Sequence, residues 1–501
     1  MHTSFRIRIA KRGRPFIAID HFEIPRGKLT FLFGESGIGK TLLSKAVYGL
    51  LDPATLDIRI NDHSYGAWLA RPALADLQAR GFFVFQEPSS HLNPLMSLED
   101  QLREGTLADA PDESAILQRL WRESGDARMR EILRVYPKPY RPSGGEKQRI
   151  LLAMAFKKLA RMRGEGGDPG ESLFVFDEPT GSLDNRLRNR FLDMLMEHLA
   201  EFPATAMLIT HDYSMISHLM ENHAARLEQV AFRELARDGD GLIQRDFDPR
   251  RYLDWIASTR TEAAPPPAGS EPVLNLKSGY RVFGRRMGIT RGDARDTETP
   301  LVVRPGEMVY LKAGSGVGKT TLARIVMGLQ PCEDLHLSLG SLTLTDASDR
   351  RDWRRHVWAK RMGMVFQHAD ESLNLNDTVG QAFAGLPVTP RITGDRLVTL
   401  LRALFDRGLP EGFLERRIGQ LSGGQKQRLN LLRTLALDTP LVILDEPLNG
   451  LDFGSMQRVI ALLRERQRQG TAILMISHNE EIFDAIIPPS HTYHLSTGPE
   501  H

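Results

Sequence analysis

Five short motifs occur twice in this chain in the same order, and this repetition predicts two copies of one fold. The lysines of the two glycine-rich loops, Lys40 and Lys319, are 279 residues apart, and the serines of the two SGG tripeptides have the same separation. The separation falls to 268 between Asp177 and Asp445, because the first copy contains the additional glycine-rich segment 161–172. We expect that segment to form a surface loop.

The composition fits two ordinary cytosolic domains. A chain of 501 residues is long enough for two repeats of roughly 230 residues, each with its own core. Lysine and arginine number 65 against 63 aspartates and glutamates, so the formal charge of +2 gives no strong nucleic-acid signal. The single cysteine, Cys332, excludes an intrachain disulfide and cysteine-based zinc or iron–sulfur sites. A reducing, cytosolic setting is expected.

No segment of the sequence is expected to cross a membrane. Apolar and basic residues alternate over the first 16 positions, which predicts a first strand instead of a secretion signal. No uninterrupted run of about 18 apolar residues occurs, so the chain is not expected to span a bilayer alone. If it serves a membrane process, other chains must supply the spanning part.

The order of the predicted elements is typical of an α/β fold. An apolar strand, residues 29–33 or 308–312, leads into each glycine-rich loop, and a helical pattern follows the loop. Continuous apolar runs precede the two aspartate–glutamate pairs and the two later histidines, as expected for parallel strands buried on both faces. Residues 98–136 and 379–417 are predicted to be rich in helix and to form a subdomain beside each sheet.

A change in composition near the middle of the chain predicts the domain boundaries. We expect a first domain over residues 1–235, a connector over 236–273 and a second domain over 274–501. The connector contains the helix-like sequence RRYLDWIAS and then the proline-rich sequence TEAAPPPAGSEP at 261–272. Prolines at this density favour an extended, semi-rigid spacer between the domains.

The two glycine-rich loops contain the residues needed to bind a nucleoside triphosphate. Backbone N–H groups at the start of a helix converge on phosphate oxygens, a lysine neutralises the β- and γ-phosphates, and a threonine hydroxyl binds Mg²⁺. A glycine-rich turn without function is the alternative, which is disfavoured because the loop occurs twice with the same partners. Ala313 replaces the first glycine in the second copy, which leaves the geometry of that loop open. The predicted ATP-binding residues are Gly34, Glu35, Ser36, Gly37, Ile38, Gly39, Lys40 and Thr41 in the first copy and Ala313, Gly314, Ser315, Gly316, Val317, Gly318, Lys319 and Thr320 in the second.

An aspartate–glutamate pair ends an apolar run in each copy. Asp177 and Asp445 are placed to bind Mg²⁺, and Glu178 and Glu446 are placed to polarise the water that attacks the γ-phosphate. Solvated acids at the end of a strand are the alternative. That alternative is disfavoured because both pairs are followed by a similar turn and a further aspartate.

A glutamine and a histidine follow apolar runs in both copies. The glutamines are predicted to contact the metal or the attacking water, and the histidines to hydrogen-bond the γ-phosphate. Either residue type alone is more often an ordinary core or surface residue, but the matched order favours a function. The predicted catalytic residues are Glu178, His211, Gln86, Glu446, His478 and Gln367. The predicted metal ligands are Thr41, Gln86, Asp177, Thr320, Gln367 and Asp445.

The SGG tripeptides complete a pattern that resembles the ATP-binding cassette (ABC) ATPase family. The signature residues are Ser143, Gly144, Gly145 and Glu146 in the first copy and Ser422, Gly423, Gly424 and Gln425 in the second. The resemblance covers nearly the whole chain apart from the connector. It implies an α/β fold class with two tandem P-loop nucleotide-binding domains, each a mainly parallel sheet core with an antiparallel β part and a helical subdomain. It also implies ATP and Mg²⁺ as cofactors of an ATPase reaction.

The same resemblance implies that the ATP sites are shared between the copies. In the family, the signature helix of one cassette caps the γ-phosphate held by the other, so Ser422 would complete the site of Lys40 and Ser143 that of Lys319. An intramolecular cassette dimer is thus expected, in which neither cassette hydrolyses ATP well alone. Both sites are expected to be competent but unequal. The site that combines the alanine-containing loop with the signature preceded by Pro142 is expected to be slower.

The segment after each glutamine indicates a branch of the family. Residues 86–102, QEPSSHLNPLMSLEDQL, resemble the corresponding segment of oligopeptide, dipeptide and nickel importer ATPases. They have one apparent extra residue near His91, and residues 367–383 are a looser version of the same segment. This resemblance implies transmembrane permease partners, an extracytoplasmic solute-binding protein and a peripheral position on the cytoplasmic face of the inner membrane. A simple turn rich in serine, asparagine and proline is the alternative.

Two classes of function stay open from the sequence. The favoured one is the energising subunit of a membrane importer for a peptide, metal complex or similar small solute. The cysteine-containing C-terminal extension common in peptide importers is not found, so a peptide substrate is not established. The rival is a soluble, non-transport ABC ATPase, such as the translation-factor F class or an accessory to phosphonate breakdown. The proline-rich connector and the two retained histidines favour transport.

The resemblance also implies an aromatic residue that stacks on adenine upstream of each loop. Tyr280 and Phe283 are the candidates in the second copy, and Phe16 is the candidate in the first. The sequence does not choose between Tyr280 and Phe283.

Overall fold

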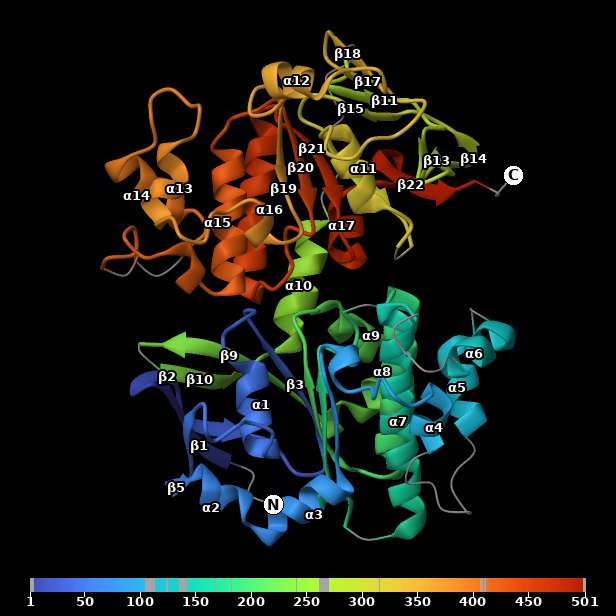
Figure 1. Ribbon diagram of the computed structural model, residues 1–501, viewed down its shortest axis with the longest axis vertical. Helices are drawn as coiled ribbons and strands as arrows, with labels where there is room; N and C mark the ends of the chain where they lie inside the picture. Colours follow the sequence, from blue (N-terminus) through green and yellow to red (C-terminus); the bar gives the residue numbers. More distant parts are fainter. Residues whose placement is uncertain are drawn as a thin grey trace. The chain divides into compact units, whose positions relative to one another are not determined.

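The computed structural model describes residues 4–103, 113–122, 125–134, 142–166, 168–181, 183–239, 241–260, 270–314, 316–405, 409 and 411–498. The chain divides into two compact units, Met1–Leu253 and Asp254–His501, and each has an α/β architecture (Figure 1). Within the described residues, no helix is both long and apolar enough to cross a bilayer. The proline-rich segment 261–269 lies outside the described residues.

A parallel sheet forms the centre of the first unit. Its strands, in spatial order, are β6 (Phe82–Val84), β7 (Leu173–Asp177), β8 (Thr205–Ile209), β3 (Leu29–Gly34) and β9 (Val230–Asp238). Every residue of β3, β7 and β8 is buried, as expected of parallel strands covered on both faces. The continuous apolar runs of the sequence therefore form central parallel strands.

An antiparallel part continues this sheet to ten strands, in the order β5-β4-β1-β2-β10-β9-β3-β8-β7-β6. The added strands are β1 (Ser4–Lys11), β2 (Arg14–Glu23), β4 (Asp57–Ile60), β5 (His63–Ser64) and β10 (Gly241–Asp246). Apolar and polar residues alternate along β1, and its apolar residues Phe5, Ile7 and Ile9 are buried. The alternating start of the sequence thus forms the predicted first strand.

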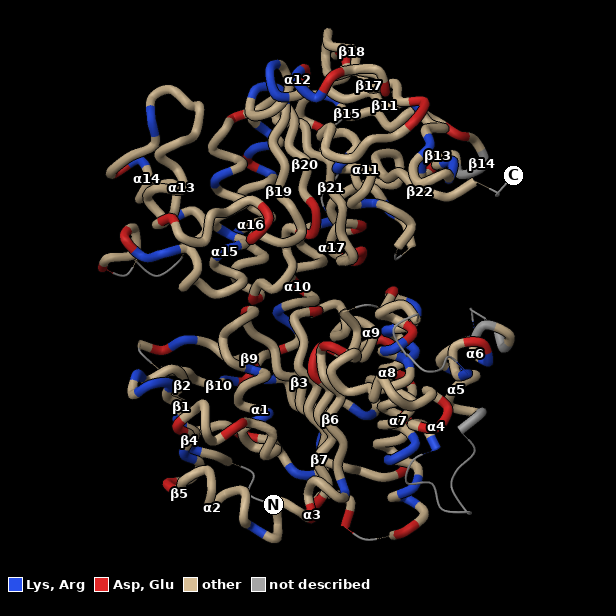
Figure 2. The backbone as a smooth tube through the Cα atoms, in the orientation of Figure 1, with Lys and Arg blue, Asp and Glu red and all other residues tan. Residues whose placement is uncertain are grey.

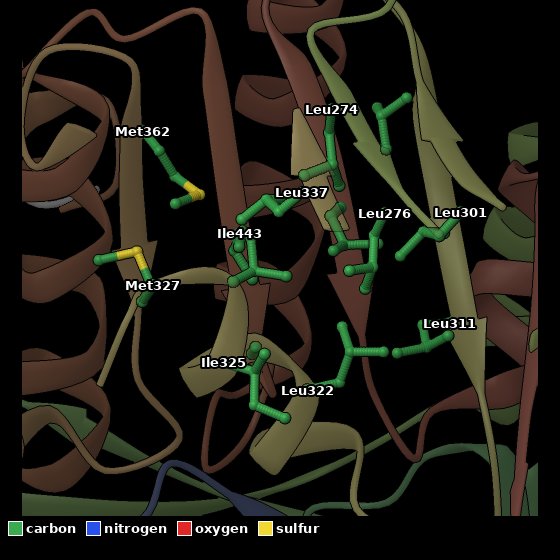
Figure 3. Close-up of a cluster of buried hydrophobic side chains, with 14 of the residues drawn as sticks. Leu274, Leu276, Leu301, Leu311, Leu322, Ile325, Met327, Leu337, Met362 and Ile443 are labelled. Atoms are coloured by element: carbon green, nitrogen blue, oxygen red, sulfur yellow. The ribbon is translucent and has the colours of Figure 1, made fainter. Parts of the chain in front are cut away.

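The second unit repeats the parallel sheet. Strands β19 (Met362–Val365), β20 (Leu441–Asp445), β21 (Ala472–Ile476), β16 (Met308–Lys312) and β22 (Thr492–Thr497) follow one another in that order. Leu311 of β16 and Ile443 of β20 are fully buried with Leu322 of helix α11 (Lys319–Val326) in one hydrophobic cluster (Figure 3). Burial of each such side chain contributes about 1.5–3 kcal/mol. The cluster holds the helix after the second glycine-rich loop against the strand before it.

The antiparallel strands of the second unit are arranged differently. A separate four-stranded sheet contains, in order, β15 (Leu301–Val303), β11 (Leu274–Leu276), β17 (His336–Leu339) and β18 (Leu342–Thr345). The main sheet is extended to eight strands by β12 (Arg281–Val282), β13 (Arg285–Arg291) and β14 (Ala294–Glu298), because β13 pairs with β22. Both units therefore have the antiparallel part that the resemblance implies.

Helices accompany the sheet in each unit. The first unit contains α1 (Lys40–Tyr48), α2 (Tyr65–Leu69), α3 (Pro72–Arg80), α7 (Gly144–Glu165), α8 (Asn185–Glu201) and α9 (Ser214–Asn222). The second contains, besides α11, α12 (Arg350–Asp352), α15 (Gly423–Leu435), α16 (Phe453–Arg468) and α17 (Glu480–Ile486). The segments predicted to be rich in helix contain α4 (Leu98–Arg103), α5 (Glu113–Trp121) and α6 (Gly125–Leu133) in the first unit and α13 (Val379–Ala384) and α14 (Gly394–Arg402) in the second.

The additional segment 161–172 of the first copy is only partly a loop. The sequence predicts a surface loop over 161–172, but helix α7 continues to Glu165 before the chain leaves it at Gly166. An ion pair of 2.6 Å between Arg161 and Glu165, one helical turn apart, supports this extension. The remainder contains a short 3₁₀ turn at Pro169–Glu171.

The expected connector 236–273 includes parts of both units. Strand β10 pairs with β9 and β2, so the boundary expected at residue 235 falls inside β9. Leu235 and Leu242 explain this arrangement, because both are buried in the core of the first unit. Helix α10 (Pro249–Thr259) follows, and the division between the compact units falls within it. The expected start of the second domain, residue 274, is the first residue of β11.

Basic and acidic residues are interspersed along the backbone of each unit (Figure 2). Exposed pairs of opposite charge are common, such as Arg286 with Glu298 at 2.5 Å. Such pairs contribute roughly 0–1 kcal/mol each. The distribution agrees with the near balance of charge in the sequence.

We expect Gly328→Ala to destabilise the second unit by about 2–4 kcal/mol. Gly328 has φ +66°, and a Cβ there would overlap the ring of Trp353. Gly340 is the matched control, because it has φ +58° and open space at its Cβ position, so Gly340→Ala is expected to cost about 1–2 kcal/mol. Hydrogen exchange of the amides in β16 and β20 measures both effects. Equal destabilisation by the two substitutions would contradict the steric explanation.

Candidate active sites

Each glycine-rich loop folds back on the lysine that ends it. Helices α1 and α11 begin at Lys40 and Lys319, after glycines with φ of 118° and 116°. Lys40 Nζ donates to the carbonyl oxygens of Gly34 at 2.6 Å and Glu35 at 3.0 Å. Lys319 Nζ donates to the carbonyl oxygen of Ala313 at 2.7 Å and to the next carbonyl at 3.4 Å. Both loops thus hold a cation at a helix N-terminus, where phosphate binds well.

The other predicted ATP-binding residues form the connection between strand and helix in each unit. Gly37 and Gly316 have the same φ of 77°, so the two loops share this part of the backbone path. Ser315 of the second loop lies outside the described residues. The described connecting residues are Glu35, Ser36, Gly37, Ile38 and Gly39 in the first unit and Gly314, Gly316, Val317 and Gly318 in the second.

The structure accounts for the alanine at the start of the second loop. Gly34 has φ +139°, and a Cβ there would lie 2.6 Å from the carbonyl oxygen of Leu235. Ala313 does not have a positive φ, and strand β16 ends one residue before it. The second loop therefore accepts a Cβ at this position without backbone strain, and its lysine keeps the same contact.

The aspartates at the ends of β7 and β20 are buried near the loop threonines. Thr41 Oγ1 donates to Asp177 Oδ1 at 2.9 Å. Among the described residues, Asp177 Oδ2 and both carboxylate oxygens of Asp445 are buried without a hydrogen-bond partner. Burial raises the pKa of Asp177 to about 6, and it raises the pKa of Asp445 against the opposing effect of Thr320. Buried carboxylate oxygens without a donor fit a cation, so these residues are suited to Mg²⁺.

In the first unit, two predicted partners contact Glu178. Gln86 Nε2 donates to Glu178 Oε2 at 2.9 Å, and His211 Nδ1 lies 3.2 Å from Glu178 Oε1. Burial acts to raise the pKa of Glu178, but the charges of His211 and Lys40 outweigh it and lower the pKa. Burial acts to lower the pKa of His211, and Glu178 outweighs it and raises that pKa. The structure therefore brings the predicted glutamine, glutamate and histidine together.

The second unit holds its glutamate differently. Glu446 Oε2 accepts a hydrogen bond from Ser477 Oγ at 2.9 Å, and His478 Nε2 lies 3.7 Å from Glu446 Oε1. Among the described residues of this unit, Gln367 makes no hydrogen bond to Glu446. Burial raises the pKa of Glu446 to about 7. The same residue types are present in both units, but the second carboxylate is held by the Ser477 hydroxyl and by the backbone N–H of His478.

Both glutamates have an uncommon backbone conformation. Glu178 has φ +46° and Glu446 has φ +52°, a region that costs an L-residue roughly 1–2 kcal/mol. Their N–H groups extend the strand pairing by one residue, donating at 2.9 Å to the carbonyl oxygens of Ile209 and Ile476. Local strain is typical of functional positions. Its recurrence at the same place supports a role for both glutamates.

The SGG tripeptides begin helices α7 and α15. The hydroxyls of Ser143 and Ser422 accept from the backbone N–H groups of Glu146 at 3.3 Å and Gln425 at 3.2 Å. The two longer side chains accept in return from the serine N–H groups, at 2.7 and 3.0 Å. Each helix therefore has a capping box, and the exchange of glutamate for glutamine preserves it. The first helical turns contain Gly144, Gly145, Gly423 and Gly424.

A further contact joins each signature helix to the segment after the glutamine. Lys147 Nζ donates to Ser89 Oγ at 3.1 Å in the first unit. Lys426 Nζ lies 3.0 Å from Asp370 Oδ1 in the second. The two lysines occupy equivalent positions, four residues after the signature serines. Exposed contacts of this kind contribute little stability, but they link the same two segments in both units.

The structure corrects one of the aromatic candidates. Tyr280 is buried in the core of the second unit, and burial raises its pKa, so its ring is not available to stack on a nucleotide. Phe283 and Phe16 are both largely exposed and lie at hairpins, between β12 and β13 and near the start of β2. Stacking by these two residues stays a prediction.

Sequence analysis missed the hydroxyl residue before each late histidine. Ser477 contacts the glutamate, whereas Thr210 Oγ1 accepts from the N–H of Asp212 at 3.0 Å. Asp212 Oδ2 in turn accepts from Arg188 Nη1 at 2.9 Å, which joins α8 to the start of α9. A signal was present, because a threonine or serine precedes the histidine in both copies.

Comparison with family models identifies the family that has these motifs. The model of the family described as ABC transporter matches residues 19–163 and 298–449, more than half of the chain. This chain belongs to the ABC transporter family. Each match contains a glycine-rich loop, the glutamine after it and an SGG signature. The chain is therefore an ABC ATPase with two ATP-binding cassettes.

Several relatives align with nearly the whole of this chain. The peptidoglycan transport ATP-binding protein YejF of Agrobacterium fabrum is 27% identical over 95% of this chain and 87% of its own length. The glutathione import ATP-binding protein GsiA of Shigella dysenteriae is 25% identical over 93% of this chain and 79% of its own length. The solved structure of an RNase-L inhibitor covers 98% of this chain and 89% of its own, with a TM-score of 0.61 and 16% identity. That likeness shows the fold alone.

Ser477→Ala is expected to impair the second cassette and to spare the first. The substitution removes the hydroxyl that donates to buried Glu446 Oε2, which costs about 1–3 kcal/mol and corresponds to roughly tenfold or more in turnover at that site. Vanadate trapping of a photoreactive ATP analogue measures the turnover of each site. Cleavage at a protease site engineered into 261–269 then separates the two cassettes, so the label on each can be quantified.

Thr210→Ala is the matched control. Thr210 makes no hydrogen bond to Glu178 in the described part of the chain, so trapping in the first cassette is expected to stay within about twofold of wild type. Equal losses in the two cassettes, or no loss after Ser477→Ala, would contradict the assignment of Ser477 as a positioning residue.

Proposed function

We propose that this ABC ATPase energises a membrane importer for a peptide, a metal complex or a similar small solute. The observation that carries the proposal is an exposed leucine in the segment after the glutamine of each cassette. Leu95 is 76% exposed and Leu375 is 37% exposed, nine and eight residues after Gln86 and Gln367. The two segments have the same length, so the leucines occupy neighbouring positions in them, one residue apart. One exposed leucine needs no explanation, but its recurrence supports a contact surface.

The names of the relatives support the same direction. One relative is named for peptidoglycan transport and the other for glutathione import, and both align with more than nine-tenths of this chain. Peptidoglycan fragments and glutathione both contain peptide bonds, so a small peptide-like solute fits best. The partners would be transmembrane permease chains and an extracytoplasmic solute-binding protein. The chain would lie peripherally on the cytoplasmic face of the inner membrane.

We further propose that each ATP site is completed by the signature of the other cassette. Lys40 would bind the β- and γ-phosphates, Glu178 would orient and polarise the attacking water, and His211 would hold both the glutamate and the γ-phosphate. Ser422 and its helix N-terminus would then cap the same γ-phosphate. The second site would use the equivalent residues, with the first signature as its cap.

Mg²⁺ would be held in each site by the loop threonine, the strand-end aspartate and the loop glutamine. The bound ion supplies positive charge that offsets the charge developing on the transferred phosphate. Asp177 Oδ2 and both Asp445 oxygens accept no hydrogen bond within the part of the chain that the structure describes, which suits them to this task. The two sites are proposed to be unequal, because Glu178 has two direct predicted partners and Glu446 has a different donor, Ser477.

The contacts of Lys147 and Lys426 would connect the segments proposed to bind the permease to the signature helices. A partner that presses on the segment containing Leu95 would act on Ser89, and Ser89 accepts from Lys147 of helix α7. In the second cassette Asp370 and Lys426 provide the same link to α15. A partner can thus bias the position of each signature, and ATP-driven closure can move the partner in return.

The alternative proposal is a soluble ABC ATPase without a transport partner, of the translation-factor F class or in phosphonate breakdown. The likeness to an RNase-L inhibitor does not favour it, since 16% identity shows the fold alone. The exposed leucines favour the importer, because both lie in the segments that resemble importer ATPases.

The double substitution Leu95→Asp, Leu375→Asp is expected to release the chain from membranes of its native host. Charged residues on an apolar contact cost several kcal/mol of docking free energy, enough to lower the sedimenting fraction at least tenfold. ATPase turnover of the purified chain should stay within about twofold of wild type, since neither leucine is among the predicted ATP-binding, catalytic or signature residues. Fractionation followed by immunoblotting provides the measurement.

Ile243→Asp is the matched control, because Ile243 is 44% exposed but lies in β10, outside both glutamine segments. It should leave membrane association unchanged. Retention of the double variant on membranes would contradict the docking surface, and sedimentation of wild type with ribosomes instead of membranes would favour the soluble alternative.

A further inference from the structure

Helices α8 and α9 lie side by side in the first cassette (Figure 1). Two histidines and an aspartate from this helix pair converge on one another. His218 Nε2 lies 2.7 Å and His223 Nε2 lies 2.8 Å from the same carboxylate oxygen, Asp193 Oδ1. The three atoms all lie within 4.8 Å of one another. The imidazole side chains are only 13% and 11% exposed, so packing holds them toward the carboxylate.

The cassette fold does not require this cluster. The residue of the second cassette equivalent to Asp193 is Ala461, at the separation of 268 that also relates the strand-end aspartates. The residues equivalent to the two histidines are Ala485 and Ser490, at the separation of 267 that relates His211 and His478. Helices α16 and α17 form without the cluster. The three side chains are thus a feature of the first cassette alone.

We propose that Asp193, His218 and His223 bind one Zn²⁺ or a similar divalent transition-metal ion. Two imidazole nitrogens and one carboxylate oxygen form a ligand set that suits zinc, with the fourth position open to water or another ligand. Ligand distances near 2.0–2.2 Å require the present nitrogen–oxygen contacts to widen by only about half an ångström. Small rotations of the three side chains supply that change.

The protons of the two imidazoles can be accommodated on binding. A neutral imidazole coordinates through Nε2 after its proton moves to Nδ1 through solvent, and a protonated one releases a single proton to solvent. Asn222 Nδ2 lies 3.2 Å from His218 Nδ1. Rotation of the amide gives up the hydrogen bond from Asn222 Nδ2 to the carbonyl oxygen of His218 at 3.0 Å, and the Asn222 oxygen can then accept the Nδ1 proton, as outer partners of metal-binding histidines commonly do.

A hollow of about 400 Å³ gives the cluster access to solvent. Its lining includes Asp193, His223, Asn222, Arg119, Arg122 and Arg190. The arginines oppose a bare cation, but they favour an anion in the fourth position, such as chloride or a carboxylate. The site therefore suits a zinc ion that carries an anionic fourth ligand.

The position of the cluster connects it to the proposed catalytic histidine. Helix α9 begins three residues after His211 and contains His218. The contact of Arg188 with Asp212 already ties the start of α9 to α8. A metal at the other end would fix α9 against α8 at both ends, so zinc is expected to stabilise the segment that follows His211.

The test uses the full chain without a histidine tag, stripped of metal and kept in excess Mg²⁺ so that the carboxylates of the ATP sites do not take the probe. Titration with Co²⁺ is expected to give one equivalent of visible absorption per chain, which Zn²⁺ abolishes. Zn²⁺ is expected to slow hydrogen exchange of peptides covering 211–223. Calorimetry with Zn²⁺ gives the affinity.

Two variants separate metal binding from a simple hydrogen-bonded clamp. Asp193→Asn keeps an oxygen that accepts from both imidazoles but removes the charge, and it is expected to weaken Zn²⁺ binding at least tenfold. The double variant His218→Gln, His223→Gln is expected to abolish the site. Glu197→Gln is the matched control, because Glu197 lines the same hollow one helical turn from Asp193 but is not in the cluster.

Binding of a fluorescent ATP analogue confirms that each variant is folded. The proposal is wrong if stripped wild type takes up no stoichiometric Zn²⁺. It is also wrong if folded Asp193→Asn and the folded double variant bind Zn²⁺ as tightly as wild type. In either case the three residues form only a hydrogen-bonded clamp between α8 and α9.

Discussion

The parallel pairing of strands β3, β8 and β7 is the constraint on which the first site depends. In this ladder Leu32 pairs with Ile209, and Ile209 pairs with Asp177, so the three strands end at one edge. Loops after the carboxyl ends of parallel strands meet at such an edge. The lysine loop, the aspartate–glutamate pair and the late histidine are therefore brought together by backbone register. Strands β16, β21 and β20 repeat the same register in the second cassette.

This shared backbone leaves the side chains free to differ between cassettes. Glu178 is contacted by a glutamine and a histidine, whereas Glu446 accepts from the serine at position 477. The second loop begins with alanine because its backbone does not need a positive φ at that position. The histidine–aspartate cluster occurs only in the first cassette, where the second has alanines and a serine. The differences in side-chain contacts between the two sites thus arise from a few local substitutions on one common scaffold.

The sequence predicts the central strands well, because residues buried on both faces produce continuous apolar runs that few other structures require. The sequence predicts less well the features that depend on tertiary packing. Tyr280 is a candidate for stacking on adenine in the sequence, but in the structure it is buried in a core. Strand β10 lies in the expected connector, but its Leu242 is buried in the core of the first unit. The donor to Glu446 depends on side-chain orientation, which a motif does not encode. Asp193 and His218 lie 25 residues apart on different helices, so no local sequence pattern predicts their contact.

The proposed sharing of each ATP site between the cassettes is tested most directly by disulfide formation. In a Cys332→Ser chain with both catalytic glutamates changed to glutamine, cysteines at Ser36 and Ser422 should crosslink when ATP is added, since a disulfide needs Cα atoms within about 7 Å. Cysteines at Ser36 and Ser143, within one cassette, should not crosslink. ATP-dependent crosslinking of the second pair without the first would contradict sharing and would assign each site to a single cassette.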